Sequence, residues 1–202
     1  MTVPQVETHA PVETDRRLRA DARRNRARII DSARKVFAEF GAEAQIDDVA
    51  RRAGVGVGTV YRHFPTKEAL IAEIVREKFR VMAVNAREAL ERDGEPFAVF
   101  ADLLRTNAEL CARDAGVQEA ITSYGESVWV YAQAELQELY VPTAELIARA
   151  QRARTMRPDV TVDDIPMLMC GVSATMPHSG AGFDWHRHLE FVIDALRVQC
   201  AD

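Results

Sequence analysis

The stretch from Ile46 to Phe64 restricts the fold more than any other part of the chain, because it predicts two very short helices joined by a glycine turn. Apolar residues at positions 46, 49, 50 and 53 give one helical face. Val60 and Phe64, four residues apart, give the inner side of the next helix, and Gly54 permits the turn between the two. This pattern predicts a helix-turn-helix.

Longer helices are predicted on both sides of this motif. Apolar residues recur at helical spacing between residues 24 and 40, and Gly41 ends that helix. Pro65 stops the second short helix, and Thr66 can then cap a long helix over about residues 67–90. The motif is therefore expected to be held between two longer helices.

The rest of the chain also has helical periodicity and no useful strand-like alternation. We expect a helix from Pro96 to about Arg113, then helices near 115–139 and 142–156 with Pro142 at their junction. A loop follows at Arg157-Pro158. The predicted fold is all-α.

Two final helices are predicted, each with a single apolar stripe, after Thr161 and Asp164 form a variant of the capping box. Such a hairpin can pack on its own domain, on a second copy of the chain, or on both. The stripes give the candidate dimer-interface residues Ile165, Leu168, Met169, Val172, Leu189, Val192, Ile193 and Leu196.

Charge is distributed unevenly along the chain. Residues 1–80 contain 16 Lys and Arg against 12 Asp and Glu, while residues 81–202 contain 10 against 19, which gives the overall net charge of −5. A basic end on an acidic body favours a DNA-binding head, although asymmetry of this size alone favours it only weakly. We expect a disordered arm over residues 1–20, a DNA-binding domain over 21–68, and a regulatory and dimerisation domain over 69–202.

The side of the second short helix away from Val60 and Phe64 carries groups suited to DNA. Hydroxyl and imidazole groups can bond phosphates or base edges, and a glycine lets the backbone approach the groove. Arg62 can read guanine or contact the backbone, and arginines upstream can reach phosphates or the minor groove. Tyr61 could instead be a packing residue. The candidates from this reasoning are Arg24, Arg26, Val57, Gly58, Thr59, Tyr61, Arg62, His63 and Lys67.

This stretch resembles the DNA-binding domain of the TetR/AcrR family of transcriptional regulators. The resemblance covers about residues 24–72 and rests on Ala50, Ala53-Gly54-Val55, Thr59, Tyr61-Arg62-His63-Phe64, Lys67 and Leu70, with Ile30, Ala33, Phe37 and Gly41 upstream. Residues 157–172 resemble the branch with an SbtR-like C-terminal domain.

The resemblance implies a homodimer that binds a palindromic operator and releases it when a small molecule enters the C-terminal domain. It assigns operator contacts to Thr59, Tyr61, His63 and Lys67. The chain departs from the family in having Ala44-Gln45 where a Ser or Thr is common, so the phosphate contact there falls to Gln45 or to the arginines. Family members are most often repressors.

The interior of the second domain offers candidate contacts for a small-molecule effector. Most aromatic side chains at helical spacing belong to a core, but as a group they favour an apolar or aromatic ligand. The candidates for this pocket are Phe79, Met82, Phe100, Cys111, Trp129, Tyr131 and Tyr140.

Other classes of protein fit the sequence less well. We find no nucleophile elbow, phosphate loop or metal-ligand spacing, so we expect no catalytic residue, no metal and no cofactor. An architectural DNA binder without a ligand would need more distributed positive charge than this acidic second domain supplies. The three widely spaced cysteines, together with the absence of a signal-like N-terminus and of a 20-residue apolar run, favour the cytoplasm over a membrane.

Overall fold

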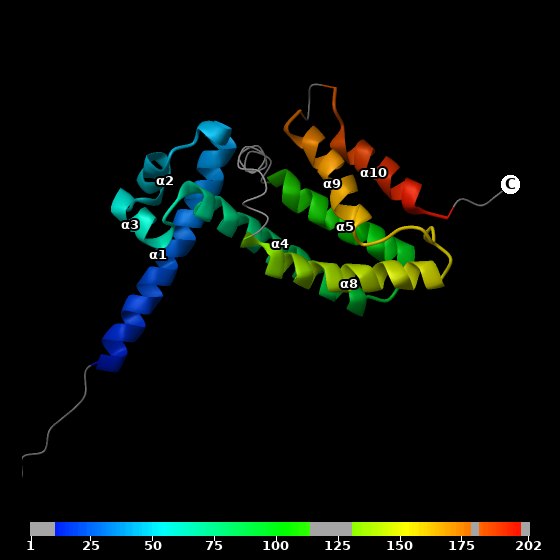
Figure 1. Ribbon diagram of the computed structural model, residues 1–202, viewed down its shortest axis with the longest axis horizontal. Coiled ribbons are helices and arrows are strands. Elements are labelled where there is room, and N and C mark those ends of the chain that lie inside the picture. Colours follow the sequence, from blue (N-terminus) through cyan, green and yellow to red (C-terminus); the bar gives the residue numbers. More distant parts are fainter. Residues whose placement is uncertain (1–10, 114–130, 179–181, 199–202) are drawn as a thin grey trace, which may run out of the picture.

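A computed structural model describes residues 11–113, 131–178 and 182–198. All regular secondary structure in these ranges is helical, apart from an isolated bridge between Met156 and Arg197. The expected all-α fold is confirmed. Figure 1 shows a small group of helices, α1 to α3, joined by the long α4 to a larger group formed by α5, α8, α9 and α10.

The first helix is longer than expected. α1 runs from Pro11 to Phe40, so residues 11–20 are helical rather than part of a disordered arm. Pro is tolerated in a first turn, and the arginines and alanines that follow are strong helix formers with no glycine or proline among them before Gly41. Gly41 has a φ of 52° and opens the 3-10 turn η1 (Gly41–Glu43).

The two short helices begin and end close to where the sequence predicts. α2 spans Ile46–Ala53 and α3 spans Val57–His63. Gly54, at the C-cap of α2, has a φ of 63°, a left-handed conformation that a side chain disfavours. The helix-turn-helix is thus formed by local signals, namely a glycine between the helices and Pro65 after them.

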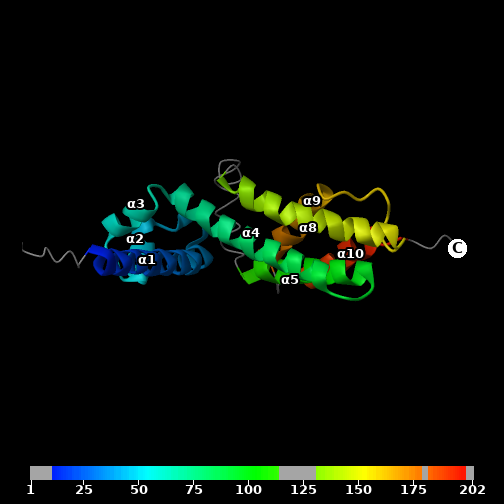
Figure 2. The same ribbon diagram turned by 90° about the horizontal axis from the view of Figure 1, so that it is seen from below.

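α4 spans Lys67–Glu91 and begins at the predicted cap. The Thr66 hydroxyl oxygen accepts a hydrogen bond of 3.1 Å from the backbone N–H of Ala69. Figure 2 shows α4 running from the head, beside α1, into the larger body, beside α5 and α8. One rigid helix therefore belongs to both parts of the molecule.

The body is built from α4 with α5 (Pro96–Arg113) and α8 (Gln133–Arg152). α5 has the predicted limits. Pro142 lies inside α8, whereas the sequence suggested a junction there. Pro142 and Thr143 are buried, and the Thr143 hydroxyl donates to the carbonyl of Leu139 across 2.7 Å. Packing and this hydrogen bond stabilise α8 around Pro142, whose nitrogen has no hydrogen to donate to the preceding turn.

The last two helices form the predicted hairpin. α9 spans Asp164–Thr175 and continues into the 3-10 turn η2 (Met176–His178), and α10 spans Trp185–Leu196. The Asp164 carboxylate accepts the Thr161 N–H at 2.7 Å, which is one half of the expected capping box. Two clusters of buried apolar side chains result, one centred on the head and the first turns of α4, the other on α5, α8, α9 and α10.

Candidate DNA-binding surface and interior cavity

The helix-turn-helix is fixed from inside by apolar packing and from outside by an arginine. Val49, Ala50 and Val60 are at most 1% exposed, which lets α2 and α3 cross closely. The guanidinium of Arg28, on α1, donates to the carbonyls of Ala53 and of the turn glycine that follows it. These bonds satisfy carbonyls at the end of α2, so α3 is held in one orientation.

The outer face of α3 carries the side chains that the sequence assigns to DNA. Tyr61 is 47% exposed and Val57 36% exposed, and Gly58 and Arg62 are also on the surface. Thr59 and His63 are half-buried, while Val60 and Phe64 face the core, as the spacing predicts. The exposed face combines hydroxyl, guanidinium and imidazole donors, the groups that bond phosphates and base edges.

Gly58 leaves room on this face. Among the described residues, no atom lies within 4 Å of the position that a Cβ at Gly58 would take. The backbone of α3 can therefore come close to another molecule there.

Three other candidate DNA contacts already have partners within the chain. Lys67 donates to the carbonyl of Ala42 at 2.7 Å, and Gln45 donates to the carbonyl of Glu43 at 2.7 Å. Arg24, which is exposed, pairs with Asp21 one turn away on α1. An ammonium has three donors, so the bond to Ala42 does not by itself prevent Lys67 from binding a phosphate.

Arg26, another candidate DNA contact, also has partners within the chain. Its guanidinium lies 2.9 Å from the carboxylate of Glu73, which is buried on α4, and 5.3 Å from the centroid of the Phe64 ring. The sequence misses this because the partner carboxylate is 47 positions away. Arg26 is a residue that joins the head to α4.

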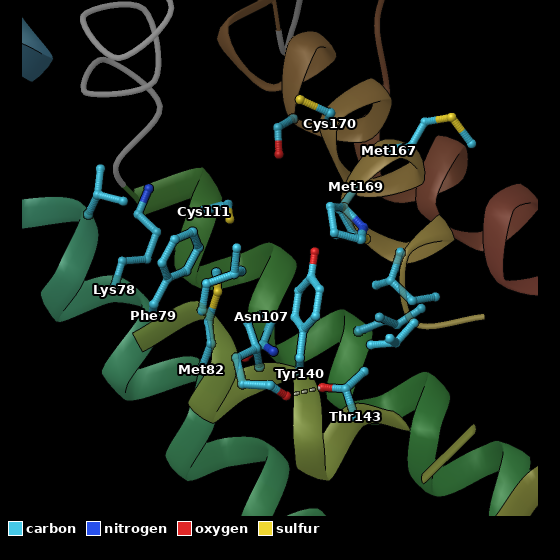
Figure 3. Close-up of a pocket in the computed structure, with 18 residues that line it drawn as sticks. Lys78, Phe79, Met82, Asn107, Cys111, Tyr140, Thr143, Met167, Met169 and Cys170 are labelled. Carbon is cyan, nitrogen blue, oxygen red and sulfur yellow. Dashed lines mark hydrogen bonds between the residues drawn. The ribbon is translucent and has the colours of Figure 1, made fainter. Parts of the chain in front are cut away.

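A cavity of about 490 Å³ lies in the body between α4, α5, α8 and α9. Figure 3 shows Phe79 and Met82 on α4 facing Met169 and Cys170 on α9, with the Tyr140 ring projecting between them. Its lining is almost entirely apolar and comprises Val75, Lys78, Phe79, Met82, Leu104, Asn107, Cys111, Leu136, Leu139, Tyr140, Thr143, Val162, Ile165, Pro166, Met167, Met169, Cys170 and Ser173.

The polar side chains in the lining are Lys78, Asn107, Tyr140, Thr143 and Ser173. The Asn107 carbonyl oxygen accepts from the Asn85 amide at 2.9 Å. Burial, with the nearby charge of Asp163, raises the pKa of the Tyr140 hydroxyl, which keeps it a neutral hydrogen-bond donor. The cavity can therefore hold an apolar body and orient it through one or two hydrogen bonds.

The structure brings together some of the predicted pocket residues and not others. Phe79, Met82, Cys111 and Tyr140 line the cavity. Phe100 does not line it, because it is fully buried beside Phe97 in the core.

Of the remaining two predicted pocket residues, one lies outside the lining and the other cannot be placed in the described ranges. Tyr131 is 63% exposed on the surface. Trp129 lies outside the described residues. Helical spacing identifies an inner face, but it cannot tell which inward side chains leave a space between them.

The residues proposed for a dimer interface mostly belong to the chain's own core. Five of the eight are buried and form part of the apolar cluster inside the body. The other three, Leu168, Met169 and Val192, are half-buried and pack against that cluster. The single apolar stripe of each of the two helices, α9 and α10, packs into this cluster, together with side chains of α5 and α8. The buried positions are Ile165, Val172, Leu189, Ile193 and Leu196.

The exposed apolar residues of this hairpin are different ones. Met167 on α9 is 68% exposed and Phe191 on α10 is 58% exposed. Both lie on the side of the helix opposite the predicted apolar stripe. An apolar residue on the otherwise polar side of a helix is the sequence signal that could have identified them. Met167 also borders the cavity, and Arg187 lies over the Phe191 ring, but both side chains keep most of their surface accessible to another molecule.

Two other kinds of site are absent from the described ranges. No group of three His, Cys, Asp or Glu side chains there is placed to hold a metal ion. In the same ranges, no helix has both the length and the apolar character needed to cross a bilayer.

A helix-turn-helix head joined by a shared helix to a helical body with an apolar cavity defines a class of DNA-binding regulators. Two family models match the chain: bacterial regulatory proteins of the tetR family over residues 29–74, and the SbtR-like transcriptional regulator C-terminal domain over residues 95–198. The chain belongs to the tetR family of transcriptional regulators, whose members are DNA-binding proteins and not enzymes. The expected resemblance, including the SbtR-like branch, is confirmed.

Relatives agree with this assignment. A TetR transcription regulatory protein from Mycobacterium vanbaalenii is 38% identical, with a TM-score of 0.62 over 90% of this chain and 99% of that one. An HTH-type transcriptional regulator of Staphylococcus aureus is 26% identical over 61% of this chain and 67% of its own length. The transcriptional regulator FadR from Bacillus subtilis, solved in complex with stearoyl-CoA, shares the fold at 20% identity, with a TM-score of 0.65 over 83% of this chain and 95% of that one.

Proposed function

We propose that this protein is a homodimeric repressor that binds a palindromic operator and releases it when a small apolar ligand occupies the cavity. One observation carries the proposal: α4 begins at the helix-turn-helix and also forms a wall of the cavity, through Val75, Phe79 and Met82. A ligand that changes the position of α4 in the body therefore changes the position of the head.

The ligand follows from the lining. Most of its side chains are apolar, and the polar ones are Lys78, Asn107, Tyr140, Thr143 and Ser173. We therefore propose an apolar or aromatic small molecule with one hydrogen-bonding group near Tyr140. The complex of FadR with stearoyl-CoA supports the view that this fold can hold a ligand with a long apolar chain. A ligand shifts the dimer only by its differential affinity for the two head arrangements.

The dimer is proposed to form through the outer side of the hairpin. Met167 and Phe191 leave an apolar surface on α9 and α10, and half-buried Leu168 and Val192 adjoin it. Two copies joined there would present two α3 helices to successive major grooves, about 34–36 Å apart. A protein that acts on operator DNA would work in the cytoplasm, and we propose that location for it.

The experiment has two stages. Purified protein is first screened against apolar compounds for an increase in melting temperature. A compound that raises it is then titrated into the complex with a fluorescent operator, isolated by selection from random DNA. Loss of operator anisotropy supports the proposal, whereas cavity ligands that leave operator affinity unchanged contradict it.

A further inference from the structure

A network of five charged side chains lies between the head and the body. Glu73 on α4 forms an ion pair with Arg26 on α1 at 2.9 Å, and it accepts hydrogen bonds from Arg76 at 3.3 Å and from Arg80 at 3.2 Å. Glu135 on α8 accepts from Arg76 at 2.8 Å and from Arg80 at 2.9 Å. The two carboxylates thus share two arginines, and the network joins three helices.

Both carboxylates are buried, so they depend on these partners. Glu73 is 5% exposed and Glu135 6% exposed. Burial alone would raise the pKa of Glu135, but hydrogen bonds from Arg76 and Arg80 hold it below its ordinary value. The other carboxylate oxygen of Glu135, Oε2, is buried and accepts no hydrogen bond from the described residues. Such an arrangement is weak evidence for stability, because replacing buried ion pairs with apolar groups is often neutral or stabilising.

The ends of the network lie at the two functional regions. At one end, Arg26 lies over the ring of Phe64, the C-cap residue of the recognition helix α3. At the other end, Glu135 directly precedes Leu136, which lines the cavity, and Val75 lies two residues after Glu73. A displacement of α8 against α4 at the cavity changes the partners of Glu73, and through them the hold on Arg26.

We propose that Glu73, Arg76, Arg80 and Glu135 are positioning residues that transmit the state of the cavity to α3 through Arg26. The inference rests on the proposed function for its role in operator release. The network itself can be tested without DNA. Proximity does not demonstrate coupling, so the test must measure the non-additivity of two substitutions.

The test is a double-mutant cycle between Arg26→Gln and Glu135→Gln in the full-length protein, read by hydrogen exchange of the amides of residues 57–64. We expect Glu135→Gln to speed exchange in α3 at least about threefold in the presence of Arg26 and to have little effect in the Arg26→Gln background. Any direct contact of Arg26 with another molecule cancels in the cycle. Equal effects in both backgrounds, or faster exchange confined to α4 and α8, would overturn the proposal.

The chain offers a matched control on the same two helices. Glu138 on α8 pairs with Arg87 on α4 at 2.8 Å, and both side chains are about half exposed. Glu138→Gln removes an α4–α8 ion pair outside the network and is expected to leave exchange in α3 unchanged. If it has the same effect as Glu135→Gln, the effect is a general loosening of α8 and the proposal fails.

The same cycle is repeated on the dissociation constant for the selected operator. We expect the loss caused by Glu135→Gln to be at least about fivefold smaller in the Arg26→Gln background, and additivity within about twofold would contradict the proposal. If the wild-type protein binds no DNA, the proposed function fails while the exchange cycle still decides the coupling. If Glu135→Gln does not fold, Arg80→Gln replaces it, since it removes one bridge and leaves Glu135 paired with Arg76.

Discussion

The ammonium of Lys67 donates a hydrogen bond of 2.7 Å to the carbonyl oxygen of Ala42, which ties the first residue of α4 to the turn after α1. The same ammonium lies 5.8 Å from the centroid of the Phe37 ring. The lysine that the sequence assigns to a phosphate therefore also holds the head together, and its substitution tests both roles.

Lys67→Ala is expected to weaken binding to all DNA sequences and to flatten the dependence of log K on log salt by about one unit. It should also destabilise the protein by about 1 kcal/mol, because a hydrogen bond to a charged group is lost. Titrations at several salt concentrations, with denaturant unfolding, separate the two effects. Lys35→Ala, which removes an exposed lysine paired with Asp31, is the control. A slope unchanged by Lys67→Ala would remove Lys67 from the phosphate contacts.

Tyr61→Phe is expected to lower operator affinity about five- to tenfold, because a hydrogen bond to a phosphate oxygen is worth about 1 kcal/mol. The melting temperature should stay the same, since the side chain is 47% exposed. Fluorescence anisotropy and thermal unfolding measure the two quantities. Tyr131→Phe, an exposed tyrosine outside the head, is the control. Unchanged affinity in Tyr61→Phe would mean that this hydroxyl does not contact DNA.

The two glycines of the motif should respond in opposite ways to alanine. Gly54→Ala is expected to destabilise the head by about 1–2 kcal/mol, because its φ of 63° is left-handed. Gly58→Ala should stabilise α3 by about 0.5–1 kcal/mol and yet weaken operator binding at least tenfold, since the methyl group blocks close approach. Unfolding and binding curves check both, and tight operator binding by Gly58→Ala would show that the backbone does not approach the groove there.

Filling the cavity should separate ligand binding from DNA binding. Ser173 is 9% exposed and lines the cavity on α9. Ser173→Leu is expected to weaken binding of the neutral dye Nile red at least about tenfold, while operator affinity changes less than twofold. Dye fluorescence and operator anisotropy are the measurements, with Ser173→Ala as the control that adds no bulk. Equal dye binding in both variants would place the dye, and by extension the ligand, elsewhere.

The sequence predicts best where structure depends on local signals. The limits of α3 and the start of α4 follow from Pro65 and Thr66, which act within one turn. The length of α8 does not follow from a local signal. Packing and the hydrogen bond of the Thr143 hydroxyl keep the chain helical past Pro142. The ion pair of Arg26 is missed for a similar reason, since its partner Glu73 is distant in sequence.

Periodicity likewise separates inside from outside but does not place a cavity. Phe79 and Phe100 are both buried at helical spacing, and only Phe79 faces empty space. The stripes on α9 and α10 are inward as predicted, but they meet the chain's own core instead of remaining open to a second copy. Whether an inward side chain faces a cavity or the core, and whether a stripe stays exposed, depends on how several helices pack together. The sequence of one helix does not contain that information.

The measurement that tests the central claim most directly is selection of bound DNA from a random pool, using purified protein at near-physiological salt. The account predicts an enriched palindrome with half-sites about one helical turn apart, bound by two copies of the chain. Folded protein that enriches no sequence, with and without the compounds that raise its melting temperature, would contradict the account.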